Sequence, residues 1–219
     1  MTVDAARMEF YYASRASEYD DVYLKPERQP DLRDIEKWLP PIFAKATVLE
    51  VACGTGHWTQ FLAPAASRVV GLDASPETLH FARGRVLGEN VSFVVGDAYS
   101  VPLRLGKFSA AFAGFWFSHV PLGRRSRFLR GLNASLSRGS RVVLLDNRFV
   151  EGSSSPISET DAEGNTYQLR KLKDGSTHRV LKNFPTEEEL HGSLATAGVH
   201  GKLTVWEYFW AFEYVASEP

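Results

Sequence analysis

The chain has 219 residues, with 25 Lys and Arg against 26 Asp and Glu and a formal net charge of −1. This length predicts a single domain, and a composition of 44% hydrophobic and 23% charged residues excludes a mainly disordered or fibrous chain. The near-neutral charge offers no basic field for nucleic acid or anionic lipid, and no run of roughly 18 apolar residues predicts a membrane span.

The first residues, which are charged, do not resemble a signal peptide, so we expect a soluble, cytoplasmic protein that is a monomer or homodimer. The one cysteine, Cys53, excludes an internal disulfide and a cysteine-rich zinc site, and no metal is expected.

Residues 1–40 predict an aromatic, partly helical arm. Apolar residues at helical spacing from Leu32 to Leu39 indicate a helix, with Asp31 as its N-cap. The arm is either a lid whose hydroxyls orient a ligand or an aromatic staple on the fold. Its aromatic residues are Phe10, Tyr11, Tyr12, Tyr19 and Tyr23.

Apolar runs and helical segments then alternate along the chain. The runs that predict buried strands are Thr47–Val51, Val69–Leu72, Val91–Val95, Ala110–Phe115 and Arg141–Leu145. The helical segments are Trp58–Ala65, Leu79–Val86 after a Ser75 cap and Pro76, and Leu129–Leu136 ending at Gly139. This alternation predicts an α/β fold with a doubly wound, mostly parallel sheet.

The alternation of strands and helices stops after the fifth strand. Residues 150–184 have loop composition and predict an irregular insertion or lid within a single domain of residues 1–219. Thr186 and Glu189 form a capping box for a last helix that ends at Gly198, and the segment Lys202–Val215 predicts a closing hairpin.

The loop after the first strand carries the strongest functional signal. Gly54 and Gly56 lie where a strand passes into a helix, and ligands bind at such strand ends. The dinucleotide pattern G-x-G-x-x-G fails, because Ala52 and Thr59 occupy two of its glycine positions. A nicotinamide-dependent oxidoreductase is therefore the least favoured reading.

Three acids accompany this loop. Glu50 precedes it, and Asp73 and Asp97 end the second and third strands. A carboxylate at Asp73 can accept ribose hydroxyls, one at Asp97 can accept an adenine amino group, and Glu50 suits a cofactor with a positive end. Alternatively, strand-end acids can simply cap helices or bind backbone N–H groups. We favour an adenosine that carries a cation.

These motifs, in this order, resemble those of the class I S-adenosylmethionine-dependent methyltransferases. The resemblance covers about residues 45–150, with Ala52 in place of a usual glycine and Ser109 in place of a usual aspartate. It implies S-adenosylmethionine as cofactor, S-adenosylhomocysteine as product, and a Rossmann-like sheet of seven strands whose last strand is antiparallel. The matching motifs are Leu49–Gly56, Gly71–Ser75, Gly96–Ala98 with Val101 and Pro102, and Phe108–Pro121.

The resemblance also implies roles for individual residues. The expected cofactor-binding residues are Glu50, Ala52, Cys53, Gly54, Gly56, Asp73, Ala74, Asp97, Ala98 and Phe115. The expected substrate-binding residues are Tyr11, Tyr19, Tyr23, Trp116, Asn147 and Arg148.

Several roles stay open. His119 is the candidate catalytic residue, as a proton acceptor near the transferred methyl group, or else a structural residue. Cys53 packs in the loop rather than acting as a nucleophile. Arg15 and Arg28 either pair with the cofactor carboxylate or are solvated. Four residues of the insertion set specificity if the insertion covers the site, and otherwise they lie on the surface. They are Tyr167, Arg170, His178 and Lys182.

The predicted function is methyl transfer to a small-molecule, aromatic or heteroaromatic acceptor by in-line displacement. Such a reaction is accelerated mainly by positioning the acceptor and excluding water, and a general base is needed only when the acceptor is protonated. A macromolecular (protein or RNA) methyltransferase and a non-catalytic adenosyl-binding module are the alternatives. The acceptor and the methylated atom stay undetermined at this stage.

Overall fold

The computed structural model describes residues 11–12, 15–194 and 197–217. Phe10 of the predicted arm lies outside these ranges. In the described residues the chain forms a seven-stranded sheet in the order β3-β2-β1-β4-β5-β10-β9. Its strands are β1 (Thr47–Val51), β2 (Arg68–Asp73), β3 (Val91–Val95), β4 (Phe108–Gly114), β5 (Leu136–Asn147), β9 (Gly198–Val205) and β10 (Phe209–Ala216).

The sheet is mostly parallel. Strand β1 pairs in parallel with β2 and β4, β2 with β3, and β4 with β5, whereas β10 runs antiparallel to both β5 and β9. The predicted α/β fold with an antiparallel last strand is therefore confirmed. The carboxyl ends of β1 to β5 meet at one edge, which is where the acids and glycines of the sequence collect.

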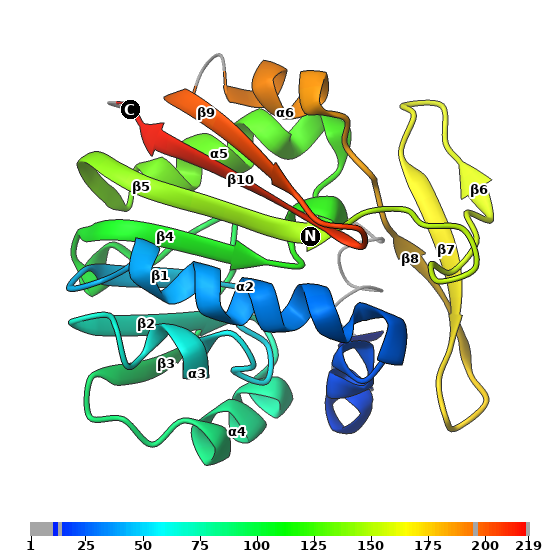
Figure 1. Cartoon of the computed structure of the whole chain (residues 1–219), viewed down its shortest axis with the longest axis horizontal. Coiled ribbons are helices and arrows are strands. Elements are labelled where there is room, and N and C mark those ends of the chain that lie inside the picture. Colours follow the sequence, from blue (N-terminus) through cyan, green and yellow to red (C-terminus); the bar gives the residue numbers. More distant parts are fainter. Residues whose placement is uncertain (1–10, 13–14, 195–196, 218–219) are drawn as a thin grey trace.

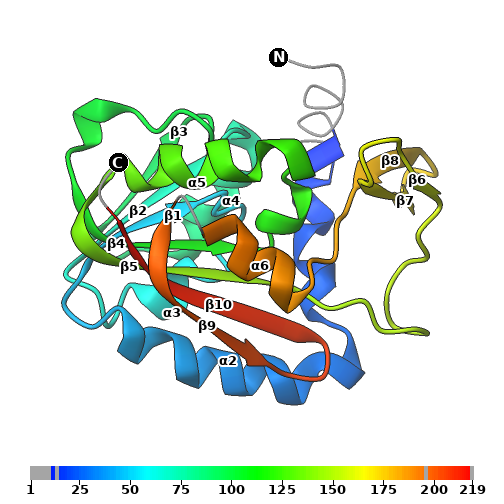
Figure 2. The ribbon, with the colours of Figure 1, turned by 90° about the horizontal axis from the view of Figure 1, so that it is seen from above.

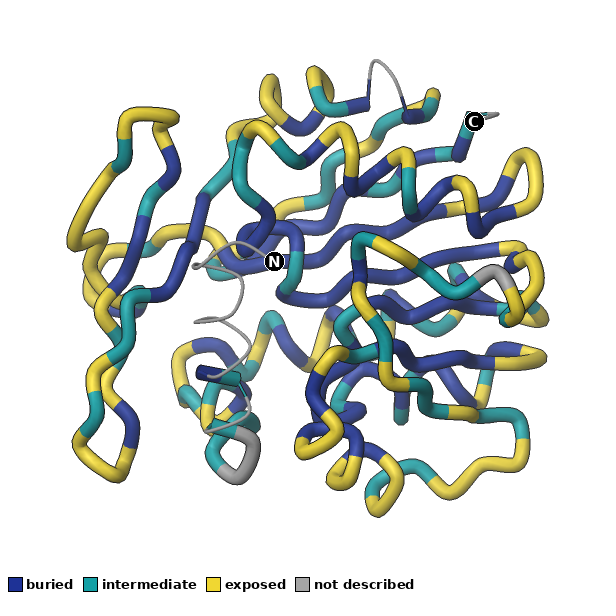
Figure 3. The backbone as a smooth tube through the Cα atoms, turned by 180° about the vertical axis from the view of Figure 1, so that it is seen from behind, coloured by how far each residue is buried: buried dark blue, intermediate teal, exposed yellow. Residues whose placement is uncertain are grey.

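Helices cover both faces of the sheet (Figures 1 and 2). Buried side chains of α2 and α3 pack on one face, and those of α5 and α6 pack on the other. The central strands are buried along most of their length, as Figure 3 shows. The helices are α2 (Gln29–Ile42), α3 (Thr59–Leu62), α4 (Pro76–Arg85), α5 (Arg125–Asn133) and α6 (Glu187–Leu194). Short 3-10 turns are η1 (Ala16–Tyr23), η2 (Pro26–Arg28), η3 (Leu103–Leu105), η4 (Phe117–His119) and η5 (Leu122–Arg124).

Two predicted caps are confirmed. The Ser75 hydroxyl accepts a hydrogen bond from the Thr78 N–H at 3.2 Å, with Pro76 in the first turn of α4. The Thr186 hydroxyl and the Glu189 carboxylate bond reciprocally to each other's backbone N–H groups, each at 3.2 Å, at the start of α6. Both signals are local, so sequence spacing alone finds them.

Several predicted boundaries are wrong. Asp31 does not cap α2, which begins at Gln29, but accepts a hydrogen bond from the Tyr208 N–H at 2.8 Å. Leu136 and Gly139 belong to β5 rather than to the end of a helix, because α5 already ends at Asn133. Gly198 starts β9.

The helix predicted over Trp58–Ala65 is also shorter than expected. Helix α3 has only four residues, Thr59–Leu62; Ala63 keeps helical dihedrals, but Pro64 has no N–H with which to continue the helical hydrogen bonds.

The insertion is regular, contrary to the prediction of an irregular segment. In the described chain it forms a second, antiparallel sheet of three strands, β6 (Glu159–Thr160), β7 (Thr166–Lys171) and β8 (Thr177–Leu181). The dipeptide Asp174–Gly175 turns the chain between β7 and β8, with Gly175 at φ 88°. Figure 1 shows this small sheet beside the carboxyl ends of β4 and β5.

A buried ion pair fastens the insertion to the main sheet. The Lys182 ammonium donates to Asp146 Oδ1 and to the Ser118 hydroxyl, each at 2.6 Å, and both charged side chains are at least 96% buried. Burial alone would raise the pKa of Asp146, but the Lys182 charge and the hydrogen bond from the Ser118 N–H lower it to about 2. Asp146 is therefore a carboxylate at neutral pH.

Breaking this pair is expected to cost more than breaking an exposed one. Lys182→Met leaves the Asp146 charge buried and unpaired, so the free energy of unfolding in urea falls by about 3–5 kcal/mol. The double variant Lys182→Met with Asp146→Asn recovers most of that loss. Lys173→Met, which breaks the exposed Lys173–Asp21 pair, costs less than about 1 kcal/mol and is the control. Equal losses in the single and double variants would contradict the assignment.

Candidate functional site

The loop after β1 is held in a strained, open conformation. Ala52, Gly54 and Gly56 all have left-handed backbones, with φ of 54°, 55° and 75°. The Gly54 N–H donates to Asp73 Oδ2 at 2.8 Å, which ties the loop to the end of β2. Since Ala52 is not glycine, its conformation carries a cost that the surrounding contacts must offset.

The two strand-end acids occupy neighbouring positions. Strands β2 and β3 pair in parallel with Asp73 opposite Val95, so Asp73 and Asp97 lie at the same edge of the sheet. Asp73 also accepts hydrogen bonds from the Ser75 N–H and the Thr78 hydroxyl, which leaves about one of its four acceptor positions free. Asp97 accepts one, from the Tyr99 N–H at 2.9 Å.

Glu50 lies beneath the loop. Its carboxyl is 1% exposed and accepts a hydrogen bond from the Thr59 hydroxyl of α3 at 2.6 Å. Burial, with the Asp73 charge adding to it, raises the pKa of Glu50 to about 8 against the effect of that hydrogen bond. Neighbouring Cys53 is buried against Leu79, and burial raises the pKa of its thiol, so it packs as a neutral side chain.

The aromatic arm crosses this edge and is bonded to it. A Cβ added to Gly54 would meet the Tyr19 ring at 3.1 Å, so Tyr19 lies directly on the loop. Asp20 accepts a hydrogen bond from the Thr55 hydroxyl at 2.7 Å and pairs with Arg85 of α4. The arm, the loop and α4 are thus joined at one point.

Aromatic rings also connect the arm to the end of β4. Tyr23 stacks on His57 with ring centroids 3.4 Å apart, and on Phe115 at 5.6 Å. Phe115 has a left-handed backbone at φ 58° and stacks in turn on Phe209 at 5.7 Å. Packing of this stack holds Phe115 in a conformation that a bulky residue rarely adopts.

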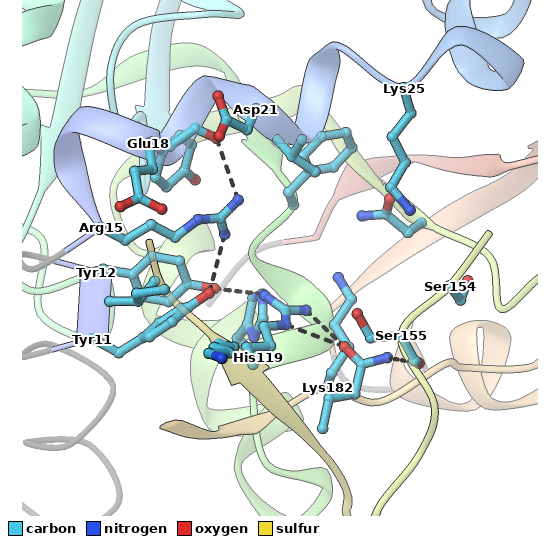
Figure 4. Close-up of a pocket in the computed structure, with 18 of the residues that line it drawn as sticks. Tyr11, Tyr12, Arg15, Glu18, Asp21, Lys25, His119, Ser154, Ser155 and Lys182 are labelled. Atoms are coloured by element: carbon cyan, nitrogen blue, oxygen red, sulfur yellow. Dashed lines mark hydrogen bonds between the residues drawn. The ribbon is translucent and has the colours of Figure 1, made fainter. Parts of the chain in front are cut away.

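A cavity of about 360 Å³ lies between the arm, the strand ends and the insertion (Figure 4). This volume suits a small ligand. Its wall includes Tyr11, Tyr12, Tyr19, Phe115, His119 and Asn147, together with residues 168–172 and Lys182 of the insertion. Asp73 and Asp97 do not line it; the loop with its acids and the cavity meet at Tyr19, which lies on Gly54 and also lines the cavity.

His119 holds a fixed tautomer in the cavity wall. Its Nδ1 lies 2.5 Å from the Leu181 carbonyl oxygen, which can only accept, so Nδ1 carries the proton and Nε2 accepts from the Tyr12 hydroxyl at 2.8 Å. Burial, and then the charges of Lys182 and Arg170, lower the pKa of His119 well below its usual value. His119 is therefore neutral, and both of its nitrogens are occupied.

The expected substrate residues separate into two groups. Asn147 lines the cavity and accepts a hydrogen bond from Arg28 at 2.7 Å, and Tyr11 and Tyr19 line it too. Arg148 is exposed and donates to the carbonyls of Trp206 and Glu207, away from the cavity. Trp116 packs on Tyr99 and Phe128 outside the lining, and Tyr23 lies in the arm's aromatic stack.

Gln168 of β7 lies in the wall and was not singled out from the sequence. Arg28, for which solvation was one of two alternatives, is only 4% exposed. The Asp174–Gly175 turn between two β-prone runs was the available signal for a hairpin that carries Gln168 and Arg170 to the site. The burial of Arg28 has no local signal, because its partners Asn147 and Ser153 are more than 100 residues away.

The loop and its acids fit an adenosine cofactor. Tyr19 lies over Gly54, where an added Cβ would meet its ring at 3.1 Å, and Asp73 and Asp97 keep acceptor positions at the ends of adjacent strands. Within the described ranges, no group of three or more His, Cys, Asp or Glu side chains is arranged to hold a metal ion. No helix there is both long and apolar enough to cross a bilayer.

Comparison with known proteins agrees with this geometry. Residues 48–139 match the family described as a methyltransferase domain. The chain is 34% identical over 102 residues to a demethylmenaquinone methyltransferase of Staphylococcus aureus (strain JH9), covering 45% of this chain and 42% of that protein. It is 29% identical over 106 residues to the demethylmenaquinone methyltransferase of Lactococcus lactis, covering 46% and 41%. The match thus spans about two fifths of the length of these relatives.

Solved structures match the whole chain. A DhpI–SAH complex superimposes with a TM-score of 0.80 and 28% identity, covering 98% of this chain and 97% of that one. A DhpI–SAM–HEP complex gives the same TM-score with 27% identity, covering 98% and 99%. The magnesium protoporphyrin IX methyltransferase of Synechocystis PCC 6803, with bound SAM, shares the fold at a TM-score of 0.66 and 17% identity, covering 99% of each chain.

The raised pKa of Glu50 predicts how stability depends on pH. An unfolded glutamate titrates near about 4.3, so the folded state binds the proton more tightly, and the free energy of unfolding falls as pH rises from about 4.5 to about 8. Glu50→Gln removes this dependence and raises the free energy of unfolding at pH 8 by about 1–3 kcal/mol. Urea unfolding at pH 5 and pH 8 measures it. A variant that is less stable than the parent at pH 8 would show that the pKa of Glu50 is not raised in the fold.

Proposed function

Since this chain belongs to the class I S-adenosylmethionine-dependent methyltransferases, we propose that it transfers a methyl group from that cofactor to a small-molecule acceptor. The single observation that carries the proposal is the whole-chain similarity to DhpI in complexes with SAH and SAM, combined with a loop and acids placed for an adenosine. The cofactor supplies an electrophilic methyl group on a sulfonium, and the chain supplies position and exclusion of water.

The strand-end edge is proposed to hold the cofactor. Backbone groups of the loop, from Ala52 and Cys53 to Gly54 and Gly56, approach it most closely. Asp73 with Ala74 accepts from the ribose, and Asp97 with Ala98 from the adenine. Glu50 supports the loop from below through Thr59, and Phe115 separates this region from the cavity.

The cavity is proposed to hold the acceptor. Its aromatic side chains, Tyr11, Tyr12, Tyr19 and Phe115, support the predicted preference for an aromatic or heteroaromatic group. The relatives act on or bind small molecules by name, a demethylmenaquinone in one case and HEP in another. A cavity of about 360 Å³ favours such acceptors over a macromolecule, whose methylation is the alternative, as is a non-catalytic adenosyl-binding role.

The arm and the insertion are proposed to cover the reaction. Residues 1–40 and 150–184 both contribute to the cavity wall, and the insertion is fixed there by the Lys182–Asp146 pair. Closing the acceptor between them excludes water and holds it in line with the methyl group.

His119 is proposed to position Tyr12 rather than to act as a free base. Its Nε2 already accepts a hydrogen bond from the Tyr12 hydroxyl. Burial and two nearby cations lower the pKa of the ring, which disfavours the imidazolium form. The Tyr12 hydroxyl is thereby fixed in the cavity wall, where its oxygen can still accept a hydrogen bond from the acceptor.

The His119 tautomer is directly testable. Long-range ¹H–¹⁵N NMR spectra of the imidazole are expected to show a proton on Nδ1 and a neutral ring throughout the interval from pH 8 to pH 5. Tyr12→Phe removes the hydrogen bond to Nε2 and shifts the Nε2 resonance while leaving Nδ1 protonated. A ring that becomes doubly protonated near pH 6.5 would instead support a general-base role.

Cofactor binding tests the function itself. Asp73→Ala is expected to weaken binding of S-adenosylhomocysteine by about 1–3 kcal/mol, or about 5-fold to 150-fold in Kd, because charged hydrogen bonds to the ribose are lost. Isothermal titration calorimetry measures it, with the exposed Asp34→Ala as control. No binding of S-adenosylhomocysteine to the parent chain would overturn the proposed function, and binding without methyl transfer to any acceptor of a broad panel would favour the non-catalytic alternative.

A further inference from the structure

The cavity carries more positive charge than the chain as a whole. Two acids lie in its wall, Glu18 and Asp21, and both are engaged by Lys173, which lies outside the lining: Glu18 accepts from the Lys173 N–H at 3.2 Å, and Asp21 pairs with its ammonium at 2.7 Å. The formal charge of the whole chain is only −1. The cations in the wall are Arg15, Lys25, Arg28, Arg170, Lys171 and Lys182.

Two of these guanidinium groups have only neutral hydrogen-bond partners among the described residues. Arg28 donates to the Ser153 hydroxyl at 2.9 Å and to Asn147 Oδ1 at 2.7 Å, although it is 4% exposed. The charges of Glu27 and Asp31 act on Arg28 from nearby, but the described contacts join neither carboxylate to it directly, and Glu27 instead accepts from the Ser153 hydroxyl at 2.7 Å. Arg170 donates to Gln168 Oε1 at 2.9 and 3.2 Å. A buried charge without a directly bonded counter-charge is costly, and an anionic ligand would lower that cost.

Lys182 completes the group. Its ammonium donates one hydrogen bond to Asp146 and one to Ser118, so the third N–H can donate to a ligand. Burial lowers the pKa of Lys182 to about 8 against the effect of Asp146, and the ammonium is still charged at neutral pH. The charges of Lys182 and Arg170 both lower the pKa of His119, so both cations lie near this histidine.

Resting on the proposed methyl transfer, we propose that the acceptor carries an oxyanion, which Arg170, Arg28 and Lys182 bind at the insertion side of the cavity. Carboxylate, phosphate and phosphonate groups share the chemistry that these donors recognise, and guanidinium forks match all three. The aromatic side chains of the arm then contact the rest of the molecule. The oxyanion fixes the acceptor's orientation relative to Phe115 and the strand ends.

These cations are distinct from those that can serve the cofactor. Arg15 stacks on the Tyr19 ring, which lies on Gly54, so Arg15 belongs to the cofactor side. Arg28, Arg170 and Lys182 instead bond to the end of β5, to the insertion and to Ser118. Figure 4 shows Arg15 and Lys182 on opposite sides of His119.

The test uses the full chain saturated with S-adenosylhomocysteine. Inorganic phosphate, methylphosphonate and acetate are titrated separately by calorimetry at constant ionic strength, and their relative affinities distinguish a phosphoryl-type group from a carboxylate. At least one is expected to bind in the millimolar range or tighter. Arg170→Gln weakens that binding about tenfold or more, while the Kd for S-adenosylhomocysteine changes less than about twofold.

The controls separate this inference from the proposed function. Arg148→Gln removes an exposed arginine that bonds to the β9–β10 turn, and it leaves anion binding unchanged. Arg170 is half-buried and its partner is neutral, so the melting temperature of Arg170→Gln is expected to equal that of the parent chain. Arg28→Gln is the second variant, and a change in its melting temperature would identify a folding defect.

Three results would overturn the inference while S-adenosylhomocysteine still binds. In the first, none of the three anions binds to the parent chain. In the second, Arg170→Gln and the parent bind the anion equally well. In the third, Arg170→Gln loses affinity for S-adenosylhomocysteine instead of for the anion. Absence of S-adenosylhomocysteine binding by the parent chain is detected first, and it overturns the proposed function together with the inference.

Discussion

The buried pair between Asp146 and Lys182 joins the two sheets of the molecule, and the candidate acceptor site depends on it. Asp146 lies at the carboxyl end of β5 and Lys182 directly follows β8. The energy needed to remove both charges from water is offset by their mutual attraction and by hydrogen bonds with Ser118, whose N–H donates to Asp146 and whose hydroxyl accepts from Lys182. Because the pair fixes the insertion against the strand ends, the cavity has a wall of defined geometry rather than an open edge.

The main sheet could be predicted from the sequence because its signals are local and strong. Parallel strands covered on both faces are continuous apolar runs, and Thr47–Val51 and Val91–Val95 were found with their exact bounds. The caps at Ser75 and Thr186 depend on residues three positions apart. The placement of Gly54 beside Asp73 follows from the rule that parallel strands end at one edge, and the hydrogen bond between them agrees with it.

The acceptor side could not be predicted in the same way, because its geometry depends on partners far apart in the chain. Strands β7 and β8 are short and half polar, so the insertion lacks a clear periodic signal. Arg28 is buried by residues far away in the chain, among them Asn147, Ser153 and Phe209. Two adjacent residues also have different surroundings, since Asn147 lines the cavity while Arg148 donates to the β9–β10 turn.

The distribution of charge gives the site a direction. Asp73 and Asp97 accompany the glycine loop at the strand ends, with a neutral Glu50 beneath it, while Arg28, Arg170 and Lys182 lie on the insertion side. Both sets are partly buried, so their fields are weakly screened by solvent. The proposed cofactor, a cationic sulfonium, would be favoured on the first side and the proposed oxyanion of the acceptor on the second. Such a distribution would place opposite charges on the two partners of the displacement before they meet, and it would supply orientation without a catalytic base.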